Sequence, residues 1–558
     1  MSANRLIYLP LGGAGEIGMN CYVYGYGPED KERLIVVDLG VTFPDMDSTP
    51  GVDLIMADIA WLEARRDRIE AVFITHAHED HIGALGLLWG RLRVPVYARR
   101  FTAILGRLKL EENGHPPNVI TTVAARPEVI EAGPFNVQFV PIAHSIPESA
   151  ALIIDTPAGR ILHSGDFKLD ETPLVGEPWS PESFRQIAAE RPIKALMCDS
   201  TNVFSLHQGR SESTLRDPIK QLIAGASGMV VATTFASNVA RLRTLAEAAT
   251  AAGRTVCLLG RAMRKMVAAA QEAGVLTDFP STVSPEDALE VPRQNLMLIV
   301  TGSQGERRAA AAQLSRGKYL GLQLAEGDMF LFSSKTIPGN ERDVLKIVNA
   351  LSEMGVDVVD ESNGLYHVSG HANRPDLQTV HEILKPAMLI PMHGEHRHLR
   401  AHAKLAEERG IAAEIATNGI MIDLSGDTPQ IAEYIETGRS YLDGSVLIPA
   451  LSGVVRDRIR MALNGHVMIT VILDENDEPL GDAWAETSGL PANGKTGAVL
   501  SDAIETELTE FLSRADDRVI SNDDKLEEAI RRIVRQVAME EIGKKPEVTV
   551  VTSRLQQE

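Results

Sequence analysis

The stretch Thr75-His-Ala-His-Glu-Asp-His81 decides how the surrounding chain must fold. It follows the apolar run Ala71–Ile74, which predicts a buried strand and places the polar side chains on the loop at its carboxyl end. Imidazole nitrogens and carboxylate oxygens are ligands that suit Zn²⁺. The string offers four of them within six residues, more than one ion can use from so short a loop. We therefore expect a site for two metal ions.

The spacing divides these ligands into two pairs. We expect His76 and His78 to point to one side of the loop, and Asp80 with His81, one turn further on, to point to another. The alternative is a polar loop that merely contains histidines. Chance produces such a string in roughly one chain in a thousand of this histidine content, which favours the metal site.

Length, charge and cysteine content set the outer bounds. A chain of 558 residues exceeds what one hydrophobic core supports and predicts roughly two to four domains. The formal net charge of −21 excludes a basic coat for nucleic acid over the whole surface, but not a local basic channel. Cys21, Cys198 and Cys257 are far apart and form no C-x-x-C pair, which is typical of a reducing cytosol and excludes thiolate zinc sites. Residues 1–18 resemble no signal peptide and no apolar run is long enough to span a membrane, so we expect a cytoplasmic protein with no membrane partner.

Further candidate ligands stand where other strands end. They are His144 after residues 137–142, Asp166 after a hairpin over 151–162, Asp199 after 194–197, His371 after 364–368 and His393 after 387–391. A lone histidine or aspartate at a strand end is usually structural, but His144 and Asp166 occur in the order that a two-metal site needs. His163 is a weaker candidate because it lies inside a strand. Asp38, which ends the strand 34–39, either orients the ligand loop or is a plain turn residue.

From about residue 209 strands and helices alternate, which predicts a parallel sheet with its own core and hence a separate domain. The strands are expected at 229–233, 255–259 and 295–300, and the helices at 238–252, 261–273 and 302–314. Two of these helices begin at polar turns, Ser237-Asn238 and Gly302–Gly305, which either bind phosphate or simply cap the helix. The arginines nearby, among them Arg241, either line a phosphate groove or form one solvated face.

Three other motifs are interpreted as structural. Gly12–Gly18 is followed by another strand rather than a helix, so we expect a hairpin turn and no dinucleotide site. His396, His398 and His402 open a charged helix and are expected to face solvent. Gly489–Thr496 matches a phosphate-binding loop in form, but no buried strand precedes it, which argues against ATP binding.

Together, His76 to His81, His144, Asp166 and His393 resemble the ligand set of the metallo-β-lactamase fold. Asp199, Ser369-Gly-His371-Ala and Met392-His-Gly394, with the α/β insertion between them, are similar to the β-CASP nucleic-acid-processing branch. Within that branch, Leu11–Gly18, Phe235-Ala-Ser-Asn238 and the C-terminal appendage resemble the bacterial ribonuclease J family.

The resemblance implies an α/β protein, an αββα metallo-β-lactamase sandwich with an inserted α/β β-CASP domain and a small α+β C-terminal domain. The implied boundaries are 1–205 and 361–437 for the sandwich, 206–360 for the insertion, 438–455 for a linker and 456–558 for the C-terminal domain. The tail is expected to hold a hairpin, two helices and a final strand over 547–552.

The resemblance also implies roles for single residues. One zinc is held by His76, His78 and His144, the other by Asp80, His81 and His393, and Asp166 bridges the two. The implied catalytic residues are Asp80, Asp199 and His371, and the implied substrate-binding residues are Ser237, Asn238, His367, Val368, Ser369, Gly370, His371 and Ala372.

The implied activity is a zinc-dependent ribonuclease, with manganese possible as the working ion, that acts in RNA maturation and decay. A hydroxide held by two metal ions attacks phosphorus and leaves a 5′-phosphate and a 3′-hydroxyl. His371, oriented by Asp199, is the candidate general acid. The enzyme is expected to degrade RNA from a 5′-monophosphate in the 5′-to-3′ direction and to make internal cuts.

Three alternatives stay open on the sequence. A DNA-directed nuclease of the same branch would use the same phosphate chemistry. An inactive RNA-binding or assembly subunit would keep the fold, and a small-molecule hydrolase would need no inserted domain. The expected partners are single-stranded RNA, a second copy in a homodimer or homotetramer, and an RNA-decay complex.

Overall fold

The computed structural model describes residues 4–555, which divide into two units. The first unit comprises Met1–Thr42 and Met56–Arg439, and the second comprises Phe43–Ile55 and Ser440–Glu558. Each unit is described by itself. Within residues 4–555, none of the helices combines the length and the hydrophobicity needed to cross a bilayer.

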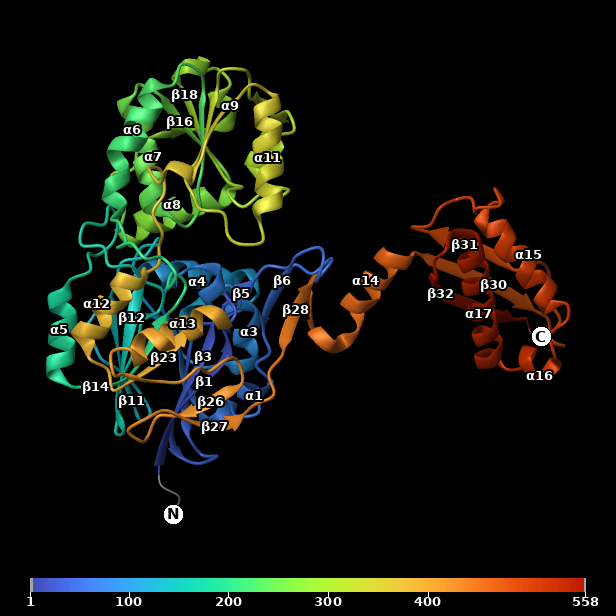
Figure 1. The fold of residues 1–558 in the computed structure, drawn as a ribbon, viewed down its shortest axis with the longest axis horizontal. Coiled ribbons are helices and arrows are strands. Elements are labelled where there is room, and N and C mark those ends of the chain that lie inside the picture. Colours follow the sequence, from blue (N-terminus) through green and yellow to red (C-terminus); the bar gives the residue numbers. More distant parts are fainter. Residues whose placement is uncertain (1–3, 556–558) are drawn as a thin grey trace. The chain divides into compact units, whose positions relative to one another are not determined.

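Two packed sheets form the base of the first unit (Figure 1). From edge to edge, the first contains β27 (Gln430–Tyr434), β26 (Ile420–Asp423), β1 (Asn4–Gly12), β3 (Cys21–Pro28), β4 (Arg33–Val37), β7 (Ile69–Ile74), β8 (Val96–Ala98) and β9 (Ile120–Thr122). The second contains β10 (Ile130–Ala132), β11 (Phe135–Pro141), β12 (Ala150–Thr156), β13 (Gly159–His163), β14 (Ile193–Asp199), β23 (Met388–Met392) and β25 (Ala412–Ala413). Tyr8 and Phe73 from the first sheet pack against Phe139 and Met388 from the second, and all four are fully buried. This interior explains why the strands are nearly continuous apolar runs.

Helices cover the outer faces of this sandwich (Figure 1). Those beside the first sheet are α1 (Ala60–Glu63), α2 (Glu79–Ile82), α3 (Leu85–Leu92) and α4 (Arg100–Glu112), and those on the second are α5 (Pro181–Glu190), α12 (Arg374–Leu384) and α13 (His396–Glu407). Phe184, Leu377 and Leu405 from the second group pack onto the sheet in one core cluster. The predicted sandwich of two sheets between two helical layers is confirmed.

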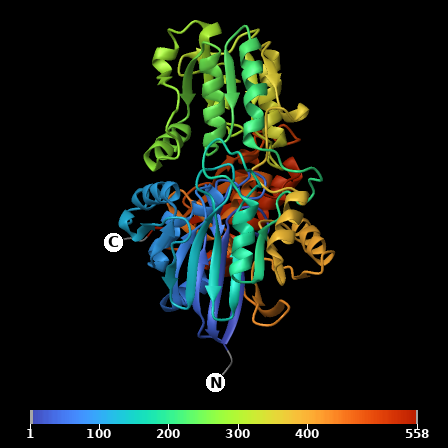
Figure 2. The same ribbon diagram turned by 90° about the vertical axis from the view of Figure 1, so that its left-hand side faces the viewer.

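The inserted domain is a separate parallel sheet in the same unit, as Figure 2 shows. Its strands are β17 (Thr282–Val283), β16 (Thr255–Leu259), β18 (Leu296–Val300), β15 (Val230–Thr233), β21 (Met329–Phe332) and β22 (Asp357–Val359), and all neighbours pair in parallel. The helices are α6 (Arg216–Gly225), α7 (Val239–Ala251), α8 (Arg261–Ala273), α9 (Pro285–Ala288), α10 (Ala310–Leu314) and α11 (Glu341–Glu353). The predicted parallel sheet is confirmed. One of its two hydrophobic clusters lies wholly within the insertion, whereas the other also includes Phe101, Leu105 and Ile146 of the sandwich.

One predicted helix of this domain is wrong. Residues 302–314 were expected to be helical, but the helix begins only at Ala310. Gly302 and Gly305 adopt φ values of +112° and +81°, which a helix cannot contain. Gln304 binds the neighbouring loop instead, donating from Nε2 to the Lys335 carbonyl at 3.0 Å and accepting from the Ile337 amide at 2.8 Å. The polar turn therefore anchors a loop and is no helix N-terminus.

The histidines of α13 correct a second expectation. His396 is exposed, but His398 and His402 are buried. The last two are four residues apart, so they share one face of the helix with Leu405 and Ala406 while Arg397 and Arg400 take the other. His402 Nδ1 lies 2.9 Å from Ser200 Oγ, and its Nε2 lies 3.1 Å from Nε2 of the buried His381.

The glycine-rich stretch forms the predicted turn between antiparallel strands β1 and β3. Gly13 has φ +83°, and a Cβ there would lie 2.0 Å from Asn20 Oδ1, so only glycine fits. The short strands β2 (Ala14–Gly15) and β24 (Gly394–Glu395) pair in parallel, and the amide of His393 donates to the Gly13 carbonyl at 2.8 Å. The turn thus fixes the backbone of a candidate ligand.

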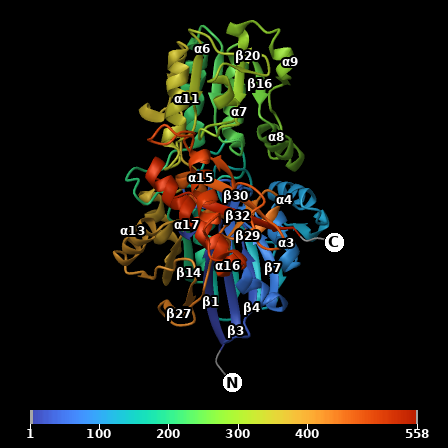
Figure 3. The ribbon, with the colours of Figure 1, turned by 90° about the vertical axis from the view of Figure 1, so that its right-hand side faces the viewer.

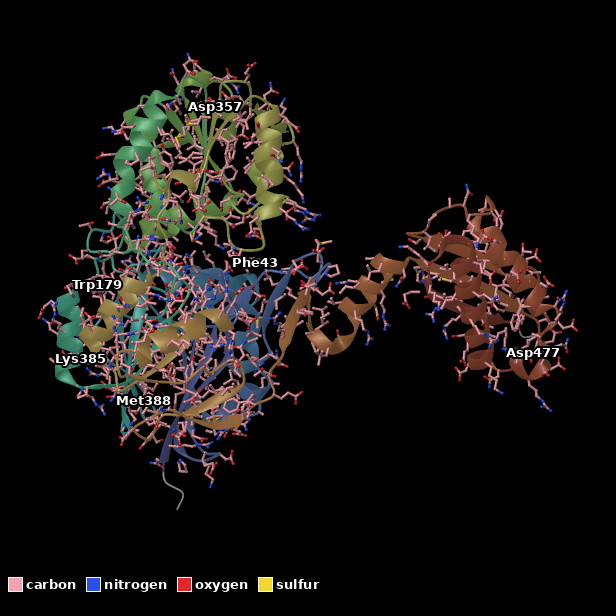
Figure 4. All side chains as sticks on the ribbon, in the orientation of Figure 1. Phe43, Trp179, Asp357, Lys385, Met388 and Asp477 are labelled. Atoms are coloured by element: carbon pink, nitrogen blue, oxygen red, sulfur yellow. The ribbon has the colours of Figure 1, made fainter. Side chains whose placement is uncertain are left out.

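The second unit is built on the three-stranded sheet β31-β30-β32. Its elements are β28 (Arg439–Asp443), β29 (Val446–Pro449), α14 (Val454–Asn464), β30 (His466–Leu473), β31 (Trp484–Ser488), α15 (Leu500–Leu512), α16 (Asp517–Ile520), α17 (Asp523–Ile542) and β32 (Glu547–Arg554). Val471 and Leu473 of β30 pack with Leu508 and Ile530 on one face of the sheet. Residues 438–455, expected as a linker, contain the β28–β29 hairpin. Figure 4 labels Asp477, which lies in the acidic turn after β30.

Candidate metal centre

The candidate ligands meet at one edge of the sandwich because several strands end there. His76 and His78 follow β7, Asp80 and His81 open α2, His144 follows β11, Asp166 follows β13, Asp199 ends β14 and His393 follows β23. Met388, which is labelled in Figure 4, is the first residue of β23 and therefore lies at the opposite end of that strand from His393. The strands therefore bring together residues that are more than 300 positions apart, such as Asp80 and His393.

The first donor set consists of His76, His78 and His144, whose ligand atoms all lie within 4.8 Å of one another. His144 Nδ1 donates to the Gly370 carbonyl at 2.6 Å, which leaves its Nε2 lone pair free for a metal. Burial lowers the pKa of His78 to about 4 and the pKa values of His76 and His144 well below the ordinary value. The three rings are therefore neutral, which is the form that binds a cation.

The second donor set consists of Asp80, His81, Asp166 and His393, again within 4.8 Å. His81 Nε2 lies 3.1 Å from Asp166 Oδ2, and His393 Nε2 lies 3.1 Å from Asp80 Oδ2. Burial opposes ionisation of Asp166, but His393 and His81 hold the pKa of this carboxyl well below its usual range. The second set therefore carries two carboxylates among its imidazoles.

Asp166 joins the two sets. Its Oδ2 lies 3.9 Å from His76 Nε2 and 4.0 Å from His144 Nε2, in addition to its contacts in the second set. One carboxylate oxygen is thus within reach of both donor sets.

The residues present fit divalent metal ions. His76 Nε2 and Asp166 Oδ1 are buried and have no hydrogen-bond partner within the described residues. Leaving such atoms unpaired is costly in a folded protein, and a coordinated cation removes that cost. A set of imidazoles and carboxylates is a donor set for zinc or a related ion.

Outer residues hold the ligands in position. Asp38 accepts a hydrogen bond from His81 Nδ1 at 2.7 Å and from the Thr75 amide at 2.8 Å, so it orients the ligand loop as the sequence suggested. Asn20 was not foreseen. Its Nδ2 donates to the Asp80 carbonyl at 2.9 Å and lies 3.0 Å from His81 Nε2. The sequence shows that Asn20 follows the glycine turn, but it does not show that Asp80 and His81 are the hydrogen-bond partners of Asn20.

His371 and Asp199 form a pair beside the second donor set. Asp199 Oδ2 accepts from His371 Nδ1 at 2.8 Å, and Asp199 is almost fully buried. Burial lowers the pKa of His371, but Asp199 outweighs it and, with the nearby carboxylates, raises the pKa to about 9. Thr201, which was also not foreseen, bridges the pair to a ligand: its Oγ1 lies 2.7 Å from Asp199 Oδ1 and 2.8 Å from His393 Nδ1.

The stretch 367–372 lies against the same centre. Ser369 Oγ accepts from Asn202 Nδ2 at 2.7 Å, and a Cβ on Gly370 would lie 2.9 Å from His144 Cε1. Val368 and Ala372 are buried in hydrophobic cores, so their side chains are not available to a substrate. His367 lies in a cationic setting: Arg241 Nη1 is 3.5 Å from its Nδ1, and burial, then Arg241, hold its pKa well below the usual value.

Ser237 and Asn238 lie at the start of α7 in the inserted domain. Asn238 Oδ1 accepts from the Arg241 amide at 3.0 Å and is therefore the N-cap of the helix. Ser237 is half-buried. Arg241 itself is fully buried against Glu212, so this arginine belongs neither to a solvated face nor to an open phosphate groove.

Four family models match successive parts of the chain. They are the metallo-β-lactamase superfamily at residues 14–213, the ribonuclease J β-CASP domain at 227–351, the RNA specificity domain of Zn-dependent metallo-hydrolases at 355–416 and the ribonuclease J C-terminal domain at 453–555.

Relatives match over nearly the full length. The chain is 40% identical over 555 residues to Ribonuclease J of Sinorhizobium meliloti, covering 99% of this chain and 98% of that protein. It is 37% identical over 544 residues to Ribonuclease J of Mycolicibacterium smegmatis, covering 96% and 95%. The fold also matches the crystal structure of a protein of unknown function from Enterococcus faecalis V583, with a TM-score of 0.51, 18% identity and coverage of 75% of this chain and 100% of that one.

Proposed function

This chain belongs to the ribonuclease J family of metal-dependent ribonucleases, and we propose that it is a zinc enzyme that degrades RNA from a 5′-monophosphate in the 5′-to-3′ direction and also cuts internally. The observation that carries the proposal is the pair of donor sets that share Asp166 Oδ2. RNA is its substrate, and the proposed roles are RNA maturation and decay.

In this proposal His76, His78 and His144 would hold one ion and Asp80, His81 and His393 would hold the other, with Asp166 within reach of both donor sets. Metal ions in these positions supply Lewis-acid activation of water and neutralise the phosphate charge. Imidazoles beside two carboxylates favour zinc, although manganese accepts the same donors.

His371 is the proposed proton donor. Since Nδ1 is engaged with Asp199, the proton that leaves must come from Nε2. A pKa raised to about 9 keeps both nitrogens protonated at neutral pH. His371 then protonates the departing 3′-oxygen, which gives a 3′-hydroxyl on one product and a 5′-phosphate on the other. Asp199 orients the ring and stabilises its charge.

Backbone and hydroxyl groups of 367–372 are the proposed contacts to the RNA phosphates. The tight approach of Gly370 to His144 places this backbone next to the first donor set. For the terminal 5′-monophosphate we propose the start of α7, where Ser237 has a hydroxyl to donate. Asn238 contributes chiefly by fixing that turn, because its side chain is already used by the cap.

Two further proposals rest on the family alone. We propose a homodimer or homotetramer and contacts with an RNA-decay complex in the cytoplasm. Light scattering of the purified full chain at several concentrations tests the first.

The deciding experiment is a time course on one RNA that carries either a 5′-monophosphate or a 5′-triphosphate and is labelled at its 3′ end. Chelator-sensitive shortening from the 5′ end, faster on the monophosphate, is the expected result. Internal cuts at the same rate on both RNAs would contradict the proposed exonuclease activity and leave only the proposed endonuclease activity. A DNA strand of the same sequence is run in parallel, and equal cleavage of it would remove the preference for RNA.

A further inference from the structure

The C-terminal unit contains an open pocket of about 350 Å³ that the proposed function does not use. It is lined by Arg460, Asn464, Arg535, Lys545 and Glu547. Figure 3 faces the side of the unit on which α17, β30 and β32 are labelled. The lining comes from the end of α14, the second half of α17 and the turn that leads into β32.

The fold fixes these three segments against one another. β30 and β32 pair in parallel, and the Glu547 amide donates to the Gly465 carbonyl at 3.0 Å, so the end of α14 lies beside the start of β32. Lys544 Nζ donates to the Leu463 carbonyl at 2.7 Å, and Arg535 Nε donates to the Pro546 carbonyl at 3.3 Å. The pocket is therefore a built feature of the unit.

The pocket has a net positive charge, whereas much of the unit is acidic. Acidic residues outnumber basic ones along residues 474–528. The pocket instead has three cations and one carboxylate, and the carboxylate of Glu547 is 3.6 Å from Arg535 Nη2. The charged groups of Arg460 and Lys545 have no hydrogen bond or ion pair with any residue from 4 to 555. Two cations in one pocket thus stay available to a ligand.

We propose that this pocket binds the phosphodiester backbone of single-stranded RNA, outside the catalytic unit. This inference rests on the proposed function, since it takes RNA as the substrate. Guanidinium and ammonium groups in one recess neutralise successive phosphates and read no base sequence. Arg460 and Lys545 supply the free charges, and Arg535 helps to hold the recess. The pocket is thus a second binding site for long RNA, in addition to the catalytic unit.

The test compares 5′-phosphorylated RNAs of thirty and of four nucleotides as substrates of the metal-loaded full chain. In the Arg460→Gln/Lys545→Gln variant, kcat/KM for the long RNA is expected to fall about 3- to 10-fold at ~0.15 M salt. The slope of log kcat/KM against log salt should become shallower by about 1.4, which is two single-strand phosphate contacts. Turnover of the short RNA is expected to stay unchanged.

Arg514→Gln/Lys525→Gln is the control, because it removes the same charge from exposed positions of the same unit. Equal values for the two variants on the long RNA would overturn the inference while short-RNA cleavage keeps the proposed function intact. An equal fall on the short RNA would also overturn it, by assigning the residues to folding. Unchanged RNA kinetics with weakened binding of a poly-glutamate peptide would make the pocket a site for an acidic protein instead. Absence of short-RNA cleavage by the unmodified chain would overturn the proposed function itself.

Discussion

The metal centre and the cluster around Arg241 are both buried groups of charged side chains in the first unit, but they are organised in opposite ways. In the Arg241 cluster the guanidinium meets Glu212 at 2.5 and 3.0 Å and donates to the Ser333 carbonyl at 2.6 Å. In the metal centre, His76 Nε2 and Asp166 Oδ1 are buried and have no hydrogen-bond partner among the described residues. Both clusters bury charged groups. Only the metal centre combines close-lying ligand atoms with buried polar atoms that lack a partner among the described residues, and this combination marks it as the functional site.

The physical consequences differ accordingly. A closed ion pair is balanced within the protein, so removing one partner leaves an uncompensated buried charge and destabilises the fold. A convergent donor set is unbalanced until a cation binds, so removing one donor lowers metal affinity and leaves the apo fold nearly as stable. Five predictions test this distinction.

The largest expected effect is in the metal centre. His78→Ala should abolish RNA cleavage, because it removes one of three imidazoles from the first donor set. Metal content by elemental analysis should fall with it, while the melting temperature of the chelator-treated chain should stay within a few degrees of the unmodified one. Full metal content in an inactive variant would contradict the ligand role.

His371→Ala separates proton donation from metal binding. The rate should fall about 10²- to 10⁴-fold, because the leaving oxygen loses its donor, while metal content stays unchanged. His371→Gln is the matched control for packing and should be as slow. Undiminished turnover in a metal-loaded variant would remove His371 from the mechanism.

Arg241→Met tests the closed cluster. It leaves the buried Glu212 carboxylate with only Lys168 Nζ, at 3.9 Å, as a counter-charge, so urea unfolding should show a loss of about 3 kcal/mol, with metal content of the folded chain unchanged. Arg185→Met is the control, because the Arg185–Glu182 pair is exposed and should contribute at most about 1 kcal/mol. Similar losses from both would mean that burial adds nothing to the Arg241 pair.

Thr201→Val tests the hydrogen bonds by which Thr201 connects Asp199 to the candidate ligand His393. The hydroxyl joins Asp199 to His393, so its loss should weaken metal affinity by about 10- to 100-fold and leave the global stability largely unchanged. Competition with a fluorescent chelator measures the affinity. Thr201→Ser, which keeps the hydroxyl, should restore most of it.

The smallest effect concerns His381 and His402, a buried pair outside the centre. Burial lowers the pKa of His381 to about 4 and that of His402 well below its usual value. Below the unfolded pKa of about 6.5 the unfolded chain takes up protons that the folded chain refuses, so stability falls as the pH drops from 7 towards 5. His402→Gln should reduce the stability difference between pH 7 and 5.5 by about 1 kcal/mol. An unchanged difference would mean that His402 is protonated in the folded protein.

Local pattern predicted the elements that carry the centre, because apolar runs specify strands whether or not their neighbours are known. Helices α7 and α8 begin and end within one residue of expectation. The wrong predictions concern polar side chains whose hydrogen-bond partners are distant in the sequence. Gln304 binds the loop at 335–337 instead of starting a helix, and Arg241 is buried against Glu212 rather than facing solvent.

The sequence by itself determined the chemistry of this protein: a string of imidazoles and carboxylates after a buried strand, more ligands at later strand ends, and an α/β insertion between them. Only the tertiary structure decided which of these groups share space and which neighbours orient them. Thr201 and His393 are 192 residues apart, and Asn20 and His81 are 61 apart. Side-chain chemistry and periodicity are local properties of a chain, whereas the partner of a buried polar group depends on the order of strands in the sheets.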